Sequence, residues 1–246
     1  MRWLALALAF SLIASREAAA NCAPVVEQGR RYEVCAFPAN DALRLFWKDG
    51  EGKPYGGLDN LARQLSADGE TLVFGMNAGM YEADLSPVGL YIENGRQLKS
   101  ANLRNGAGNF HLKPNGVFFF GDGRAGVMET SRFVAAKLRP RYATQSGPML
   151  VIGGRIHPKI RASGTSEKIR NGVGVRDGST AIFAISREPV TFHAFASLFR
   201  DRLKTPDALF LDGSVSSLFA RPDLRLGGFR SIGPIIGVVG GRPAPH

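Results

Sequence analysis

The chain has 246 residues, 44% of them hydrophobic and 21% charged, so it can form a folded core and is neither a disordered nor a fibrous chain. Its formal net charge of +10 favours anionic partners such as phosphodiesters, acidic polysaccharides or a membrane surface. The basic residues are scattered and no recognition module is visible, which argues against nucleic acid as a partner.

Residues 1–20 have the organisation of a secretory signal peptide. Arg2 supplies a positive start, residues 4–14 form an apolar stretch, and the small residues up to Ala20 suit cleavage before Asn21. The apolar stretch is too short to span a bilayer and no later segment is longer, so we expect no transmembrane segment. The expected destination is a periplasm or the extracellular space. Removing residues 1–20 leaves 29 basic and 20 acidic residues, a net charge of +9.

We expect residues 21–246 to form one domain. Cys22 and Cys35 are the only cysteines, and in an exported protein such a pair indicates a disulfide. Closing this loop would restrict the unfolded chain and contribute about 3 kcal/mol to stability. The bond would fasten the new N-terminus to the strand expected over residues 30–37. A metal site is disfavoured because few other ligands lie nearby in the sequence.

Short apolar runs separated by Asn-Gly, Asp-Gly and Gly-Gly turns indicate strands and hairpins. Single strands are expected over residues 30–37, 43–47, 71–76, 143–152, 169–176, 180–186, 208–211 and 232–239. Hairpins of two strands are expected over residues 89–98 and 114–129. Helices are expected over 58–65, 131–138 and 191–200, the last with an aromatic face that belongs to the core. No linker or repeat is visible. The pattern predicts a single α+β domain, with a mixed or antiparallel sheet, hairpins and a few packed helices.

Two of these strands end at polar residues with small neighbours. The run 208–211 stops at Asp212, and the run 71–76 stops at Asn77. A carboxylate at the end of a buried strand is held rigidly while its head meets solvent, a position that ligand sites often use. Both residues also have a structural interpretation, because Asp and Asn commonly form turns with their own backbone.

Four glycine-rich signatures stand in order at residues 75–81, 146–150, 170–174 and 211–217. Together they resemble the phosphodiester glycosidase family over residues 70–240. That family includes the uncovering enzyme, an N-acetylglucosamine-1-phosphodiester alpha-N-acetylglucosaminidase, which removes N-acetylglucosamine from a sugar phosphodiester. The family's Asn-Gly-Gly-Phe-Phe is Asn-Ala-Gly-Met-Tyr here, and its Asp-Gly-Gly-Gly-Ser-Ser is Asp-Gly-Ser-Val-Ser-Ser. Val215 adds a side chain where the family has a glycine, which allows the closest approach of a ligand. The resemblance therefore implies the fold and the position of the site, but not which sugar is bound.

The resemblance implies a hydrolase that cleaves the bond between a sugar and a phosphate. Positive charge develops on the sugar in that reaction, and a carboxylate can stabilise it, attack it, or act as acid or base. Asp212 is the candidate, and Arg170 would bind the phosphate through its guanidinium fork. Asn77 is the third candidate catalytic residue. Further substrate contacts are expected from Gly79, Tyr81, Ser146, Asn171, Gly213, Ser216 and Ser217.

Other interpretations stay open. A second carboxylate, usual in glycosidases, could be Glu82, Asp84 or Glu167, although phosphate leaves readily without a strong general acid. A non-catalytic module that binds anionic glycans at the cell envelope would explain the charge and the export signal without turnover. A serine hydrolase is disfavoured, because no Gly-x-Ser-x-Gly elbow is present. No cofactor and no metal cluster are expected, while a single oxygen-liganded cation such as Ca²⁺ stays compatible with the sequence.

Overall fold

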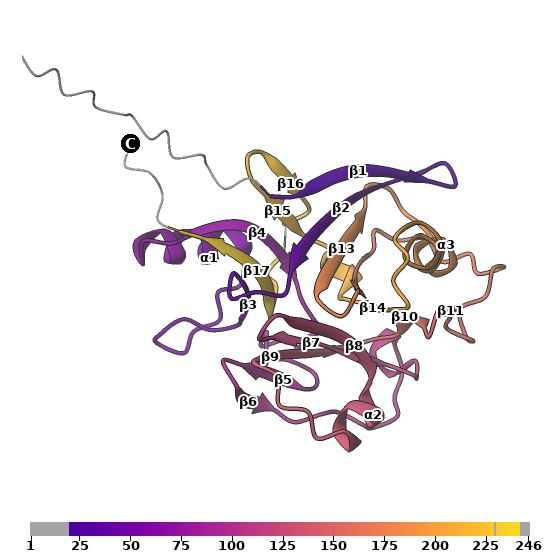
Figure 1. Cartoon of the computed structure of the whole chain (residues 1–246), viewed down its shortest axis with the longest axis horizontal. Coiled ribbons are helices and arrows are strands. Elements are labelled where there is room, and N and C mark those ends of the chain that lie inside the picture. Colours follow the sequence, from indigo (N-terminus) through magenta and orange to yellow (C-terminus); the bar gives the residue numbers. More distant parts are fainter. Residues whose placement is uncertain (1–19, 229, 242–246) are drawn as a thin grey trace, which may run out of the picture.

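The computed structural model describes residues 20–228 and 230–241. The expected signal peptide therefore lies outside the described residues, except for Ala20. Every pairing between named strands is antiparallel, and the strands form three sheets (Figure 1). Three short α-helices pack on these sheets. The predicted α+β class is confirmed, in its antiparallel form.

The first sheet has seven strands and α3 (Phe192–Ser197) covers one of its faces, continued by the π-helical turn η2 (Leu198–Arg202). Phe195 and Phe199 of this segment are fully buried in a cluster with side chains of the sheet, as the sequence predicts. The strand order is β1 (Cys22–Glu27), β2 (Arg30–Pro38), β13 (Thr180–Ser186), β12 (Asn171–Arg176), β14 (Asp207–Phe210), β10 (Met149–Ile152) and β11 (Arg155–Ile156).

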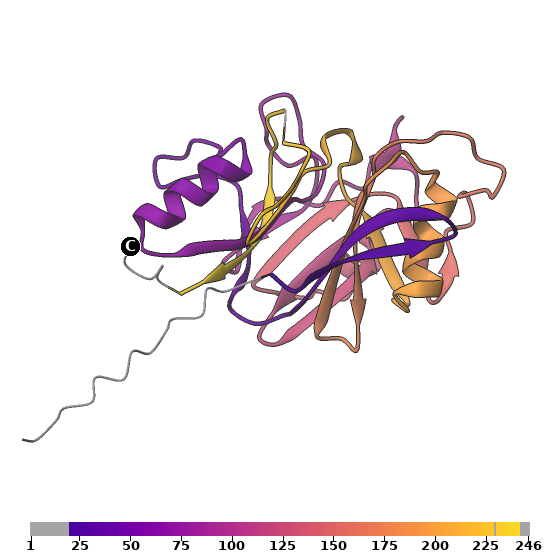
Figure 2. The ribbon, with the colours of Figure 1, turned by 90° about the horizontal axis from the view of Figure 1, so that it is seen from above.

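The second sheet has five strands and carries α1 (Leu58–Ala67) at the opposite end of the molecule from α3 (Figure 2). Leu61 and Leu65 of α1 are buried in a cluster with side chains of this sheet, because the apolar positions recur on one helix face. The strand order is β16 (Leu224–Leu226), β15 (Leu218–Ala220), β4 (Thr71–Asn77), β17 (Ile235–Gly240) and β3 (Leu43–Phe46).

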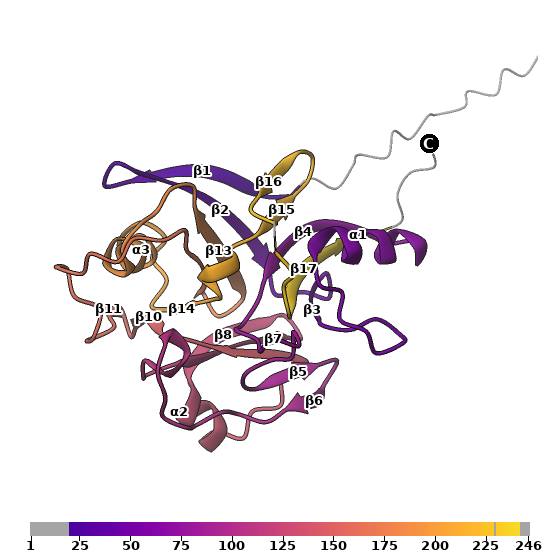
Figure 3. The same ribbon diagram turned by 180° about the vertical axis from the view of Figure 1, so that it is seen from behind.

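The third sheet lies on the other side of the core, below the first two in the view from behind (Figure 3). Phe133 of α2 (Thr130–Ala135) packs on Phe119, with ring centroids 5.3 Å apart. The strand order is β6 (Arg96–Lys99), β5 (Tyr91–Glu93), β9 (Tyr142–Ser146), β7 (Gly116–Gly121) and β8 (Arg124–Glu129). Two 3-10 turns, η1 (Asn109–His111) and η3 (Gly213–Val215), complete the assignments.

Aromatic side chains from all three sheets meet in the main core. The ring of Phe183 lies 5.1 Å from that of Phe74 and 5.9 Å from that of Phe118, measured between centroids. These residues belong to β13, β4 and β7, and all three are completely buried. Aromatic pairs at such separations add to the stabilisation from apolar burial. One shared core therefore holds the three sheets together.

Cys22 and Cys35 face each other across β1 and β2 and form the predicted disulfide. The segment predicted as one strand over 143–152 is split at Gly147-Pro148, so that β9 joins the third sheet and β10 the first. Among the described residues, no helix is long and apolar enough to cross a membrane.

Candidate active site

Three strand ends from two sheets meet at one point. Asn77 is the last residue of β4, Asn171 is the first of β12, and Asp212 follows β14 by two positions. The Nδ2 of Asn171 donates to Oδ1 of Asn77 at 2.9 Å. The Nδ2 of Asn77 in turn donates to the main-chain oxygen of Asp212 at 2.7 Å. The structure thus brings these three predicted site residues into contact.

Asn77 holds the others in place from a fully buried position. Its Oδ1 also accepts a hydrogen bond from the main-chain N–H of Ser217 at 2.9 Å. Both ends of the amide are thus engaged by the protein, by Asn171 and Ser217 on one side and Asp212 on the other. These hydrogen bonds tie the turn from Asp212 to Ser217 to the end of β4.

Asp212 is half-buried, and its charge and that of Arg230 both act on the hydroxyl of Tyr81. Burial raises the pKa of Tyr81 to about 12, with a further upward contribution from the Asp212 charge and a downward one from Arg230. The Tyr81 hydroxyl donates to the main-chain oxygen of Ser231 at 2.8 Å. The phenol of Tyr81 therefore stays neutral at neutral pH, and it lies among the side chains of Asp212 and the exposed Arg230.

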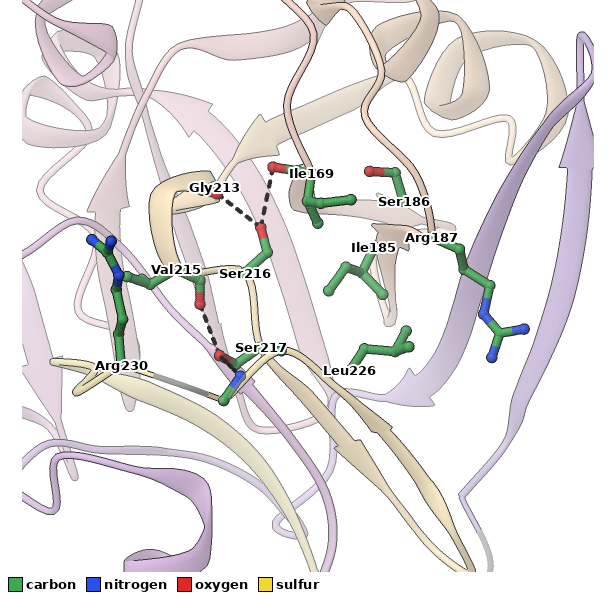
Figure 4. Close-up of a pocket in the computed structure, with 12 residues that line it drawn as sticks. Ile169, Ile185, Ser186, Arg187, Gly213, Val215, Ser216, Ser217, Leu226 and Arg230 are labelled. Atoms are coloured by element: carbon green, nitrogen blue, oxygen red, sulfur yellow. Dashed lines mark hydrogen bonds between the residues drawn. The ribbon is translucent and has the colours of Figure 1, made fainter.

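A cavity of about 370 Å³, here called the serine cavity, lies beside this group. Ser216 and Ser217 line it, and Arg187 and Arg230 lie on opposite sides of it (Figure 4). The remaining wall is largely aliphatic and is formed by Ile169, Ile185, Val215 and Leu226. An anionic group with an attached ring would find cations at the rim and apolar side chains in the wall.

The two cavity serines are held by oxygen atoms and a backbone amide of nearby loops. Ser217 Oγ donates to the Val215 carbonyl at 2.8 Å and accepts from the Gly228 amide at 3.0 Å. Ser216 Oγ lies 3.2 Å from the Gly213 carbonyl and 3.3 Å from Oδ1 of Asn171. None of these contacts, which join described residues, involves a histidine that could act as the base for a serine nucleophile.

Arg170 lies in a different environment from the one expected. Successive residues of a strand point to opposite faces, so Arg170 points toward α3 while its neighbour Asn171 points toward Asn77. Arg170 is 2% exposed, and its guanidinium carbon lies 3.6 Å from the ring centroid of Phe192. Its side chain donates to the carbonyls of Val190 and Ser166, both at 2.8 Å. Burial lowers its pKa to about 10, so the group stays charged at neutral pH. Because these contacts engage the buried Arg170 side chain within the protein, they favour a structural role over direct phosphate binding.

Of the other residues predicted to contact substrate, some line the serine cavity and others are packed inside the protein. Gly213 lines the cavity, whereas a Cβ at Gly79 would lie 2.3 Å from the Gln145 carbonyl, so packing alone requires a glycine there. Ser146 is fully buried, and its Oγ has no partner among the described residues. The candidates for a second carboxylate, Glu82, Asp84 and Glu167, are exposed and lie outside the cavity lining.

The sequence analysis missed both cavity arginines. Arg230 follows the pair Gly227-Gly228, a turn signal that could have drawn notice to this segment after β16. Arg187 directly follows β13 and lies 3.7 Å from the Glu33 carboxylate. No group of three or more His, Cys, Asp or Glu in the described part of the chain is arranged to hold a metal ion.

A model of the phosphodiester glycosidase family matches residues 70–239, which contain every strand end of this site. The chain belongs to the phosphodiester glycosidase family. A relative from Escherichia coli (strain K12), the uncharacterised protein YigE, is 35% identical over 184 residues, which cover 75% of this chain and 72% of that protein. The resemblance inferred from the four glycine-rich signatures is confirmed.

Two solved structures share the fold. The catalytic domain of zebrafish N-acetylglucosamine-1-phosphodiester alpha-N-acetylglucosaminidase, auto-inhibited by its pro-peptide, superposes with a TM-score of 0.59 at 13% identity, covering 88% of this chain and 81% of that one. A hypothetical protein from Synechocystis superposes with a TM-score of 0.53 at 14% identity, covering 90% of this chain and 61% of that one. At such identities the likeness concerns the fold.

Proposed function

We propose that this phosphodiester glycosidase family member is an exported hydrolase that cleaves the bond between a sugar and phosphate in a sugar-1-phosphodiester or a related envelope glycan. The observation that supports it most is the position of Asp212, two residues after a buried strand and directly before Gly213, which lines the serine cavity together with Arg230. A carboxylate and a guanidinium suit the two charges of the reaction, positive on the sugar and negative on the phosphate.

In the proposed reaction the bond between the anomeric carbon and the phosphate oxygen breaks, and its electron pair leaves with the phosphate. Water supplies the hydroxyl at the anomeric carbon and a proton for solvent, so the products are a free sugar and a phosphomonoester. Asp212 stabilises the positive charge that develops on the sugar. Arg230 binds the departing phosphate, the role that the sequence analysis gave to Arg170, and Ser216 and Ser217 orient the substrate by hydrogen bonds.

Two features support export. The first 20 residues have the order of charges and apolar residues that signal peptides show. The disulfide between Cys22 and Cys35 is of a kind that persists in oxidising compartments. Comparing the N-terminal residue and the location of the protein in fractionated cells tests this proposal, and an uncleaved cytoplasmic chain would contradict it.

The activity is tested with the purified mature protein and a panel of sugar-1-phosphodiesters. We expect Asp212→Asn to lower kcat by about 100-fold or more while the fold, followed by circular dichroism, is retained. Asp122→Asn is the matched control, because it removes an exposed carboxylate from the turn between β7 and β8 in the third sheet. Full activity of Asp212→Asn would refute the role of Asp212. Absence of turnover across the panel, with anionic glycans still bound, would establish a binding module instead.

A further inference from the structure

A second cavity adjoins the serine cavity on the side of α1. It has a volume of about 500 Å³ and is here called the helix-side cavity. The two cavities share the wall formed by Leu226, Gly227, Gly228 and Arg230. Both volumes lie in the range of pockets that bind small molecules. A ligand that passes Arg230 can therefore occupy both cavities at once.

The helix-side cavity is lined by a second arginine, Arg225, whose guanidinium makes two contacts within the protein. The guanidinium carbon of Arg225 lies 4.8 Å from the ring centroid of Phe219, and its Nη1 contacts the carboxylate of Asp59 in α1. Phe219 is 8% exposed and so provides a fixed surface for the guanidinium. A guanidinium held against an aromatic ring keeps its planar donors ordered for an anion.

The ion pair between Arg225 and Asp59 is open to solvent, with side-chain exposures of 59% and 64%. Exposed pairs of this kind contribute little to stability, so an anionic ligand can compete with the Asp59 carboxylate for Arg225. The guanidinium has five N–H donors, and the Asp59 contact engages Nη1. Arg225 can therefore bind an anion beside Asp59 or in its place.

We propose that the helix-side cavity binds the leaving group of the substrate and that Arg225 selects leaving groups with a second anionic group, a phosphate or a carboxylate. The proposal rests on the proposed function, in which Ser216 and Ser217 orient the substrate in the serine cavity and Arg230 binds the reacting phosphate. The shared wall then directs the rest of the substrate into the helix-side cavity. Arg230 and Arg225 line this cavity together and match two anionic groups in one ligand.

The test compares two substrates with the same sugar, one a sugar-1-phosphoglycerol and the other carrying a second phosphate on the glycerol. We expect the wild-type protein to prefer the second substrate in kcat/KM by about threefold to tenfold, the effect of one partly exposed charged contact. Arg225→Gln should abolish this preference. Asp59→Asn should increase the preference for the substrate with two phosphates. The Asp59 carboxylate competes with the second phosphate for Arg225 and also repels it, and the variant removes this carboxylate.

Arg63→Gln is the matched control, since it removes the same charge from an exposed position of α1 that does not line the helix-side cavity. This variant should keep the preference. Equal kcat/KM values for the two substrates in the wild-type protein would overturn the proposal, and so would an undiminished preference in Arg225→Gln. In either case, turnover that depends on Asp212 would leave the proposed function standing.

A binding measurement separates the two proposals when no substrate is turned over. Calorimetry with glycerol 1,3-bisphosphate should give a weaker affinity for Arg225→Gln than for the wild-type protein, and a tighter one for Asp59→Asn. Equal affinities in the three proteins would overturn the role of Arg225 whatever the activity. Raising the salt concentration should reduce the differences, because exposed charges are screened.

Discussion

The Nδ2 of Asn77 donates to the main-chain oxygen of Asp212 at 2.7 Å, across 135 positions of sequence. This hydrogen bond joins the end of β4 in the second sheet to the turn after β14 in the first. The position of the Asp212 carboxylate therefore depends on how the two sheets pack, and not only on the local turn.

Asn77→Ala should reduce both stability and activity. The substitution removes the hydrogen bonds that the Asn77 side chain makes with Asp212, Asn171 and Ser217, and we expect the free energy of unfolding to fall by about 2 kcal/mol or more. Urea denaturation measures this loss, and kcat at a temperature where the variant is folded measures the displacement of Asp212. Wild-type kcat in a folded variant would contradict the positioning role.

Arg170→Met should destabilise the fold without selectively weakening substrate binding. It removes two hydrogen bonds to carbonyls and the stacking on Phe192, which together support a loss of about 3 kcal/mol in the free energy of unfolding. The exposed Arg230 gives the contrast, because Arg230→Met should raise KM and leave the free energy of unfolding nearly unchanged. A raised KM with unchanged stability in Arg170→Met would restore Arg170 as the phosphate-binding residue.

Gly79→Ala should destabilise the protein because its Cβ would lie 2.3 Å from the Gln145 carbonyl and 2.5 Å from Oγ1 of Thr144. Forcing an extra methyl group into a packed site costs about 1–3 kcal/mol. Gly50→Ala is the control, since no atom lies within 4 Å of its Cβ position. The urea midpoints of the two variants decide this prediction. Equal midpoints would show that the loop around Gly79 adapts readily.

His157 should make the fold less stable in mild acid. Burial, reinforced by the charge of Lys159, lowers its pKa below the ordinary value of 6.5. A histidine with a lowered pKa binds its proton more weakly in the folded than in the unfolded chain, so its contribution to stability is present above pH 6.5 and is lost as the pH falls through the folded pKa. We expect His157→Gln to lose less stability than the wild-type protein between pH 7 and the acid range. An NMR titration that placed the His157 pKa at or above 6.5 would contradict this prediction.

Local patterns were sufficient for most of the strands and for the two cysteines. Side chains of the run before Asp212 alternate between two buried faces, with Leu209 in the main core and Ala208 and Phe210 in the cluster beneath α3. Because both faces are buried, the sequence of this strand is continuously apolar. The strands β1, β15 and β16 were not predicted. They are short or partly exposed, and they are defined less by their own composition than by pairing, of β1 with β2, of β15 with β4 and of β16 with β15.

The sequence by itself determined that a carboxylate ends a buried strand at Asp212, that glycine-rich turns surround it, and that the chain has the signatures of the phosphodiester glycosidase family. It also predicted Arg170 and Asn171 as neighbours in one strand and assigned both to the site, although side chains alternate along extended backbone. Only the tertiary structure decided which face meets the site. The packing of α3 against the first sheet buries Arg170, and the return of the chain between β16 and β17 brings Arg230 to the cavity. Both outcomes depend on contacts between segments far apart in sequence, whose free energy no local pattern records.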